Sequence, residues 1–143
     1  MKISSLKFVA VVISILALTS LSAPVQARST ELVEPPPVTI MCHLSADQMT
    51  KAIISGGAVR GWIAVKQEPG NIELKFVKGA YKHVINVDVS YSKNSFSIRY
   101  KDSSGLNYKV KKNGVRKIHP RPITWMMNLN MDIESKTVEL CSE

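Results

Sequence analysis

The hydrophobic residues of this chain change from helical to alternating spacing near residue 61. Before that point, Ser45 and Gln48 have the spacing of a capping box, with Ser45 as the N-cap. Apolar residues then recur at helical intervals, at Met49, Ala52 and Ile53. We therefore predict a helix over residues 46–58, which the glycine pair at 56–57 ends or weakens.

Beyond residue 61, hydrophobic and polar residues alternate, which is typical of half-buried β-strands. Turn residues separate four such stretches, at 62–66, 72–76, 83–91 and 96–101. Short connections between four strands predict an antiparallel meander with one face toward solvent. Leu106, Tyr108 and Val110 continue the alternation and predict a short fifth strand.

The last part of the chain holds a basic stretch and a second helical pattern. Residues 109–117 contain Asn113-Gly114, which predicts a surface hairpin or loop. His119 and Pro120 stand where a helix begins, since proline is tolerated in a first turn. Apolar residues follow at helical spacing, at Trp125, Met126, Leu129 and Ile133.

These patterns predict an α+β fold. The second helix should have about 12 residues and cover the sheet with its apolar face. The expected architecture has two layers: a four- or five-stranded antiparallel meander sheet, with an N-terminal and a C-terminal helix packed on one face.

The first 27 residues have the features of a signal peptide. Lys2 and Lys7 precede an apolar run from Phe8 to Leu21, and small residues follow up to Ala27. Cleavage there leaves 116 of the 143 residues and lowers the net charge from +8 to +6, because both lysines are removed. An uncleaved membrane anchor is the alternative, but the run is shorter than the roughly 18–20 residues that span a bilayer.

Residues 28–41 contain three consecutive prolines, at 35–37, which predict an extended leader. A plain spacer is favoured over a proline-rich ligand motif in an exported protein. A lipoprotein anchor at Cys42 is not favoured, because Met41 occupies the place where a lipobox needs a small residue. Residues 42–143 are predicted to form a single α+β domain.

Composition narrows the class of protein. The 45% hydrophobic and 21% charged residues exclude a disordered acidic tail and a multi-span membrane protein. Two cysteines are too few for a disulfide-rich miniprotein or a four-cysteine zinc site. In an oxidising periplasm, Cys42 and Cys141 are predicted to form a disulfide that clasps the domain. A redox or nucleophilic role is the alternative, but the sequence has no C-x-x-C motif.

The chemically active side chains are few. The histidines, at 43, 83 and 119, fit no metal motif, so no metal or cofactor is predicted. His83 lies among apolar residues and is expected to be packed. His119 is the strongest catalytic candidate, although a structural role at the helix start is favoured. Asp102-Ser103-Ser104 is interpreted as a turn, because no G-x-S-x-G nucleophile motif is present.

One pattern covers about the last third of the mature chain. It consists of Tyr100-x-Asp102-Ser103-x-x-Leu106-x-Tyr108, then Ile118-His119, then Trp125-x-x-x-Leu129-x-x-x-Ile133. The pattern resembles that of a family of small uncharacterised secreted proteins and lipoproteins of Gram-negative bacteria. Residues 121–124 depart from it, since they replace a tyrosine–asparagine pair, and no role for that pair is carried over. The resemblance implies an α+β envelope protein without an assigned reaction.

Positively charged residues are concentrated in the segment before the second predicted helix. Residues 101–121 contain seven lysines and arginines and one acid, Asp102. Such a patch attracts anionic lipids, acidic glycans or an acidic protein, whereas export makes nucleic acid an unexpected partner. The simpler interpretation, favoured by the sequence, is a solvated basic face. The candidate binding residues are Lys109, Lys111, Lys112, Arg116, Lys117, His119 and Arg121.

The sequence therefore predicts a small non-enzymatic protein of the periplasm or the exterior of a Gram-negative cell. It would bind an envelope component or an anionic surface through residues 109–121 or the open sheet face. Two alternatives stay open. One is a hydrolase-like enzyme centred on His119, with Asp102 or a tyrosine beside it, and the other is a secreted inhibitor or effector.

Overall fold

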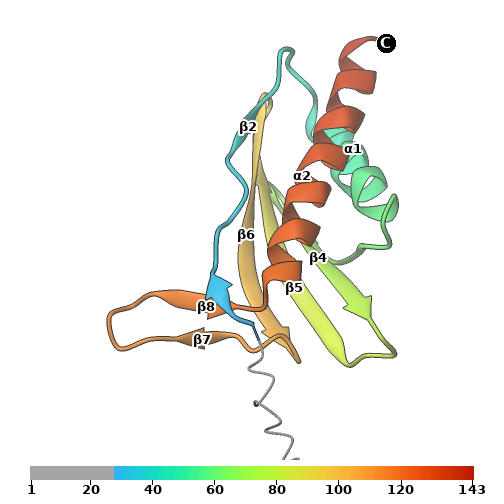
Figure 1. Cartoon of the computed structure of the whole chain (residues 1–143). Helices are drawn as coiled ribbons and strands as arrows, with labels where there is room; N and C mark the ends of the chain where they lie inside the picture. The colour runs from blue at the N-terminus through green and yellow to red at the C-terminus, as the bar shows by residue number, and fades with distance from the viewer. Residues whose placement is uncertain (1–27) are drawn as a thin grey trace, which may run out of the picture.

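The computed structural model describes residues 28–143, and the predicted signal peptide lies outside the described residues. The α+β class is confirmed: two helices pack on one face of an antiparallel sheet, and a smaller sheet lies at one end (Figure 1). The helices are α1 (Ala46–Ala58) and α2 (Pro120–Cys141). The main sheet contains β2 (Val38–Thr39), β3 (Ile63–Glu68), β4 (Asn71–Lys78), β5 (His83–Tyr91) and β6 (Ser95–Ser104). The smaller sheet contains β1 (Thr30–Glu31), β7 (Lys109–Val110) and β8 (Arg116–Ile118).

Strands β3 to β6 form the predicted meander, but the fifth strand comes from elsewhere. The order in the main sheet is β2-β6-β5-β4-β3, so the leader supplies the fifth strand through β2. The expectation that residues 106–110 continue this sheet is wrong. Gly105, at a φ of +69°, turns the chain away from β6, and Lys109–Val110 pair with β8 instead. Glycine is suited to such a turn because it has no Cβ to clash at positive φ.

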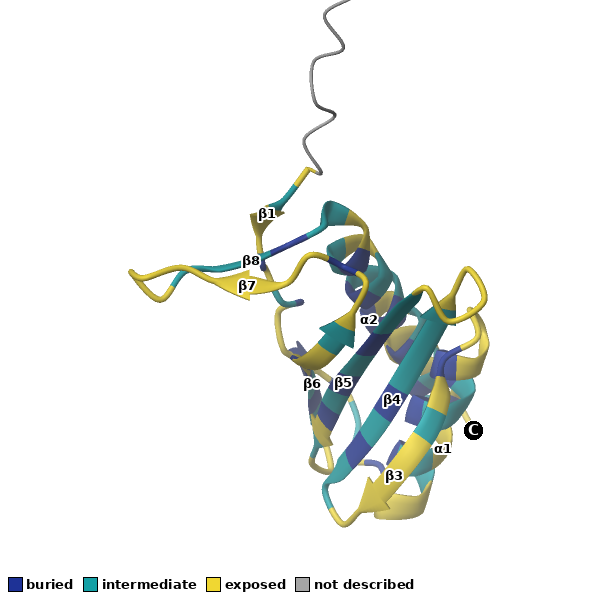
Figure 2. Cartoon of the chain, turned by 90° about the horizontal axis from the view of Figure 1, so that it is seen from below, coloured by how far each residue is buried: buried dark blue, intermediate teal, exposed yellow. Residues whose placement is uncertain are grey.

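The hydrophobic core lies between the sheet and the helices, and Figure 2 shows the strands in front of the helices that cover them. The alternating residues of β4, β5 and β6 supply the sheet side. They are Ile72, Leu74, Ile85, Val87, Val89, Phe96 and Ile98. The helices supply Met49, Ala52, Ile53, Met126, Leu129 and Ile133. The period-two and helical patterns therefore identified the two sides of the same core.

The first helix has the predicted bounds and its capping box is confirmed. The Gln48 N–H donates to Ser45 Oγ at 3.1 Å, and the Ser45 N–H donates to Gln48 Oε1 at 2.9 Å. The helix ends at Ala58, directly after Gly56 and Gly57, and both glycines are buried in its last turn. A Cβ on Gly56 would lie 2.7 Å from Ile133 Cα, so the glycine lets the two helices approach closely.

The second helix has 22 residues, and the prediction of about 12 is wrong. Beyond Ile133 the apolar pattern weakens, but Thr137 and Leu140 remain buried on the same side of the helix. His119 is the N-cap, and its Nδ1 accepts a hydrogen bond from the Arg121 N–H at 3.2 Å. No helix within residues 28–143 is long and apolar enough to cross a membrane.

The predicted disulfide is confirmed between Cys42 and Cys141, whose Cα atoms are 5.8 Å apart. The two cysteines are 99 residues apart in sequence. Cys42 precedes α1 and Cys141 ends α2, so the bond joins the start of the first helix to the end of the second.

The proline-rich leader is extended, and it packs against the domain along its length. Strand β1 pairs with β8 and β2 pairs with β6, both antiparallel. Leu32, Val38 and Ile40 are buried in the core. A plain spacer would neither pair with strands nor bury side chains in the core, so the leader contributes to the fold.

Glu34 fastens the leader between β6 and β8. Its side chain is 10% exposed and accepts hydrogen bonds from Arg99 Nη1 at 2.8 Å and the Tyr100 N–H at 3.0 Å. Arg116 Nη1 donates a third at 3.3 Å. Burial alone would raise the pKa of the Glu34 carboxyl, but these hydrogen bonds hold it below the ordinary value of 4.5.

The free energy of unfolding should therefore decrease as the pH is lowered, and part of this decrease should depend on Glu34. A carboxyl with a lowered pKa in the folded state contributes its full stabilisation above about pH 4.5 and loses it as the pH falls through the folded-state value. We expect Glu34→Gln to lower the free energy of unfolding by about 1 kcal/mol at neutral pH, and this difference to shrink in acid. Urea unfolding at a series of pH values measures it.

Glu31 provides the matched control for that experiment, because it lies in the same leader but is exposed. Glu31→Gln should change stability little, since exposed charges contribute little. A Glu34→Gln deficit that stays constant as the pH falls would contradict the assigned role of the carboxylate.

Candidate functional site

The basic segment forms the predicted hairpin, which we call the basic hairpin (residues 109–117). Strands β7 and β8 pair antiparallel, with Lys109 opposite Lys117. The turn is closed by the Lys111 N–H donating to the Val115 carbonyl at 2.9 Å, and Gly114 has a φ of +82°. In the views of Figures 1 and 2 the hairpin extends away from the main sheet and the helices.

The basic hairpin concentrates like charges. Lys109 and Lys117 are direct cross-strand neighbours, an arrangement that is destabilising on its own. The positive charge of Lys117 also lowers the pKa of Lys111. On the other side of β8, Glu31 of strand β1 lies opposite Lys117. Residues 103–131 themselves contain no Asp or Glu. Among the described residues, the ion pairs of this segment involve only Arg116, which binds Glu34.

The tyrosine and serine residues of the family-like pattern have structural contacts. The rings of Tyr100 and Tyr108 stack with centroids 4.6 Å apart. The Tyr100 and Ser103 hydroxyls are hydrogen-bonded at 2.7 Å, and burial raises the pKa of the Tyr100 hydroxyl. These contacts connect the end of β6 to the base of the basic hairpin.

The open face of the main sheet, the second predicted binding surface, pairs its charges internally. Lys101 Nζ lies 2.6 Å from Glu73 Oε2, and Asn71 Nδ2 donates to Asp88 Oδ1 at 3.2 Å. Asp102 accepts a hydrogen bond from Asn86. These polar groups satisfy one another, so this face has less unmatched charge than the basic hairpin.

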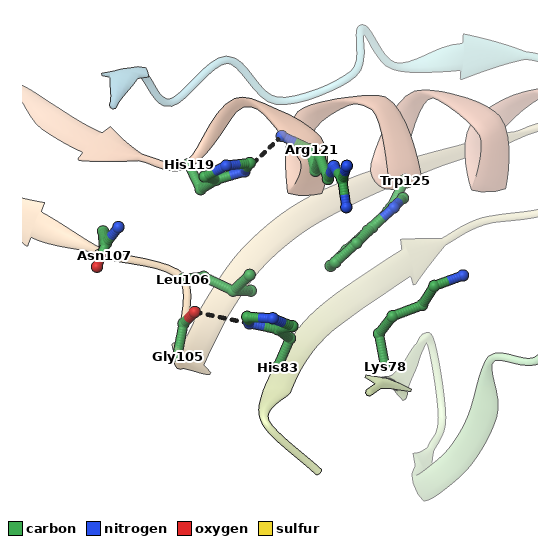
Figure 3. A pocket seen from close by; sticks show the side chains of 8 residues that line it. All are labelled: Lys78, His83, Gly105, Leu106, Asn107, His119, Arg121 and Trp125. Carbon is green, nitrogen blue, oxygen red and sulfur yellow. Dashed lines mark hydrogen bonds between the residues drawn. The ribbon is translucent and has the colours of Figure 1, made fainter. Parts of the chain in front are cut away.

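A cavity of about 150 Å³ lies at the base of the basic hairpin. We call it the histidine pocket, because it brings together two histidines that are far apart in sequence. Its lining residues are Lys78, His83, Gly105, Leu106, Asn107, His119, Arg121 and Trp125. Figure 3 shows His119 and Arg121 on one side of the pocket, His83 and Lys78 on the other, and Trp125 between them.

The fold holds both imidazole rings in place. His83 Nδ1 lies 2.8 Å from the Gly105 carbonyl oxygen, and His119 Nδ1 accepts from the Arg121 N–H. Gly105 could not be another residue, because a Cβ there would collide with the Lys82 carbonyl. Trp125 is held edge-on against Phe76, with ring centroids 5.1 Å apart.

The chemistry of the histidine pocket is cationic. None of the residues that line it is a carboxylate, a hydroxyl or a thiol. Asp102, the partner expected for a His119-centred enzyme, is bonded to Asn86 and does not line the pocket. Within residues 28–143, no cluster of His, Cys, Asp and Glu side chains could hold a metal ion.

Sequence reasoning identified part of this pocket. His119, Arg121 and Trp125 were singled out, and all three line it. Lys78 and Asn107 were missed, and His83 was expected only to be packed. The sequence held only a weak signal for these residues. Lys78 and His83 flank the turn between two predicted strands, which places both at one end of the sheet.

The cavity and the basic hairpin make this end of the molecule the candidate site. Comparison with protein-family models, with curated proteins and with solved structures finds no match for this chain. The resemblance carried by residues 100–133 therefore stays a prediction.

Proposed function

We propose that this is an exported, non-enzymatic binding protein that attaches through its basic hairpin to an anionic surface of the bacterial envelope. The observation that carries the proposal is the set of lysines at positions 109, 111, 112 and 117. Their side chains make no ion pair within the described part of the chain, and they sit on a projecting element. The predicted signal peptide and the disulfide are consistent with such a location.

The repulsion within the hairpin supports an anionic partner. Lys109 opposite Lys117 is unfavourable, and the one acidic residue in register with this pair is Glu31, opposite Lys117 on β1, so further negative groups beside the pair would relieve the repulsion. Lipid phosphates supply such groups at high density, and each lysine near an anionic membrane contributes about 1 kcal/mol to attachment. The exposed Val110, between Lys109 and Lys111 in sequence, adds a small apolar contact at such a surface.

The hydrolase alternative has less support than binding. A catalytic histidine needs a nucleophile or a substrate-activating partner within hydrogen-bond reach. The histidine pocket offers neither a hydroxyl nor a thiol among its lining residues. What it offers is positive charge, which is suited to holding an anion.

Vesicle binding tests the proposal. The purified protein should co-sediment with vesicles of phosphatidylglycerol and phosphatidylcholine and should be released by salt, because screening weakens exposed charge interactions. Replacing Lys109, Lys111 and Lys112 by Gln should weaken binding at low salt by about a hundredfold, from about 1 kcal/mol per lysine.

A second triple variant, with Gln at Lys51, Lys66 and Lys93, is the matched control. It loses the same total charge from exposed positions outside the hairpin. Equal weakening by both variants would show that net charge alone drives binding, and binding to phosphatidylcholine alone would rule out an electrostatic surface. Either result would overturn the proposal.

A further inference from the structure

We infer that the histidine pocket is a binding site for a single phosphate-type oxyanion that carries a hydroxyl proton, such as hydrogen phosphate. The inference is independent of the proposed function, because it concerns a free anion in a cavity and not a surface. The first support is charge: Lys78 and Arg121 line the pocket with two histidines, and no lining residue is acidic. The arginine guanidinium matches phosphate oxygens in geometry as well as in charge.

The second support is the hydrogen bonding of His119. Its Nδ1 accepts the Arg121 N–H, so in the neutral ring the proton is on Nε2. Nε2 makes no hydrogen bond within residues 28–143. His119 therefore has an N–H donor with no partner in this part of the chain, on a ring that lines the pocket.

His83 has the opposite arrangement. A carbonyl oxygen only accepts, so His83 Nδ1 must donate to Gly105, and in the neutral ring Nε2 is an acceptor. The two rings thus offer one donor and one acceptor from the walls of one cavity (Figure 3). Hydrogen phosphate satisfies both, since its P–O⁻ groups accept and its P–OH group donates. Sulfate and acetate have no proton to donate at neutral pH.

The backbone at the start of α2 adds little to recognition. Helix N-termini usually bind anions through free N–H groups. Here Pro120 and Pro122 have none, and the Arg121 N–H is used by His119. Selectivity must therefore come from the side chains of the pocket, which makes it testable by substitution.

The size of the cavity fits a small ion. Its volume of about 150 Å³ accommodates one phosphate group with water. Buried Leu106 and half-buried Trp125 form the apolar part of the pocket wall, beside the charged side chains.

The inference is tested by titrating the purified protein with inorganic phosphate, sulfate and acetate. Amide NMR shifts and calorimetry measure the binding in each titration. The titration is done at about pH 8, where hydrogen phosphate keeps one proton and sulfate has none. We expect saturable phosphate binding that shifts Gly105 and Asn107, and sulfate binding weaker by about tenfold, the equivalent of one hydrogen bond.

Asparagine variants separate binding from structure. In His83→Asn the side-chain amide can still donate to Gly105, and in His119→Asn the side-chain oxygen can still cap α2, because asparagine is a favoured N-cap. Both lack the distal ring nitrogen. Each should weaken phosphate binding by about tenfold without unfolding the protein, and His83→Asn should abolish the preference over sulfate. Lys51→Gln, on α1, should change nothing.

Three results would overturn the inference. They are the absence of saturable phosphate binding, equal affinity for sulfate and phosphate at about pH 8, and phosphate binding that survives in both asparagine variants. Vesicle attachment measures the hairpin separately, so a failure here leaves the proposed function untouched.

Discussion

Replacement of both Cys42 and Cys141 by serine is expected to lower the free energy of unfolding by about 4–5 kcal/mol. The bond closes a loop with a sequence separation of 99 residues, so it restricts the unfolded chain strongly. It also joins the start of α1 to the end of α2. Because a domain of this size has a total stability of about 5–15 kcal/mol, the variant should be close to its unfolding limit. Urea unfolding of the oxidised protein and the variant measures the difference.

Reduction provides the control for this prediction. A thiol reductant should bring the wild-type protein to about the stability of the double-serine variant and leave the variant itself unchanged. The expected role of the disulfide would be contradicted if the variant unfolded at the same urea concentration as the oxidised protein.

Gly56→Ala is expected to destabilise the protein by about 2–3 kcal/mol, although alanine is the better helix former. The new Cβ would lie 2.7 Å from Ile133 Cα and 2.9 Å from its backbone nitrogen. Backbone atoms cannot move aside as a side chain can, so α1 and α2 would have to separate and the core between them would loosen. Thermal and urea unfolding of the purified variant test this expectation.

Gly57→Ala is the matched control in the same helical turn. Its Cβ would meet mainly side-chain atoms, Leu74 Cδ1 at 3.2 Å and Trp62 Cβ at 3.3 Å. A small shift of the leucine methyl relieves the closer contact, and the gain in helix propensity offsets part of the cost. We expect a change within about 1 kcal/mol of wild type. Equal effects of the two substitutions would show that the close approach at Gly56 is not what sets the packing.

Local patterns determined which residues form the first helix, the strands of the meander and the hairpin turn. The capping box at Ser45 and the spacing of Met49, Ala52 and Ile53 gave the bounds of α1. Alternation over residues 72–100 identified the strand faces, because neighbouring residues on a strand point to opposite sides. Asn113-Gly114 predicted the hairpin turn for the same kind of reason, since turn geometry depends on the residues within it.

The errors occurred where distant contacts override local preference. The end of α2 carries few apolar residues after Ile133, and it is helical because Thr137 and Leu140 pack on the domain and Cys141 is fixed to Cys42. The leader has no strong strand signal, yet it is ordered by Glu34 and by pairing with β6 and β8. The partners of Glu34 lie more than 60 residues away from it in sequence. Hydrophobic periodicity reports only on residues within one element, so it does not detect such pairs.

The sequence alone determined the α+β class, the N-terminal helix, the four-stranded meander and the positive charge before α2, because these depend on residue type and short spacing. Only the tertiary structure decided where the leader packs and that His83 joins His119 in one cavity. Those features depend on how strand ends and the helix start meet in space, and no local pattern encodes that meeting.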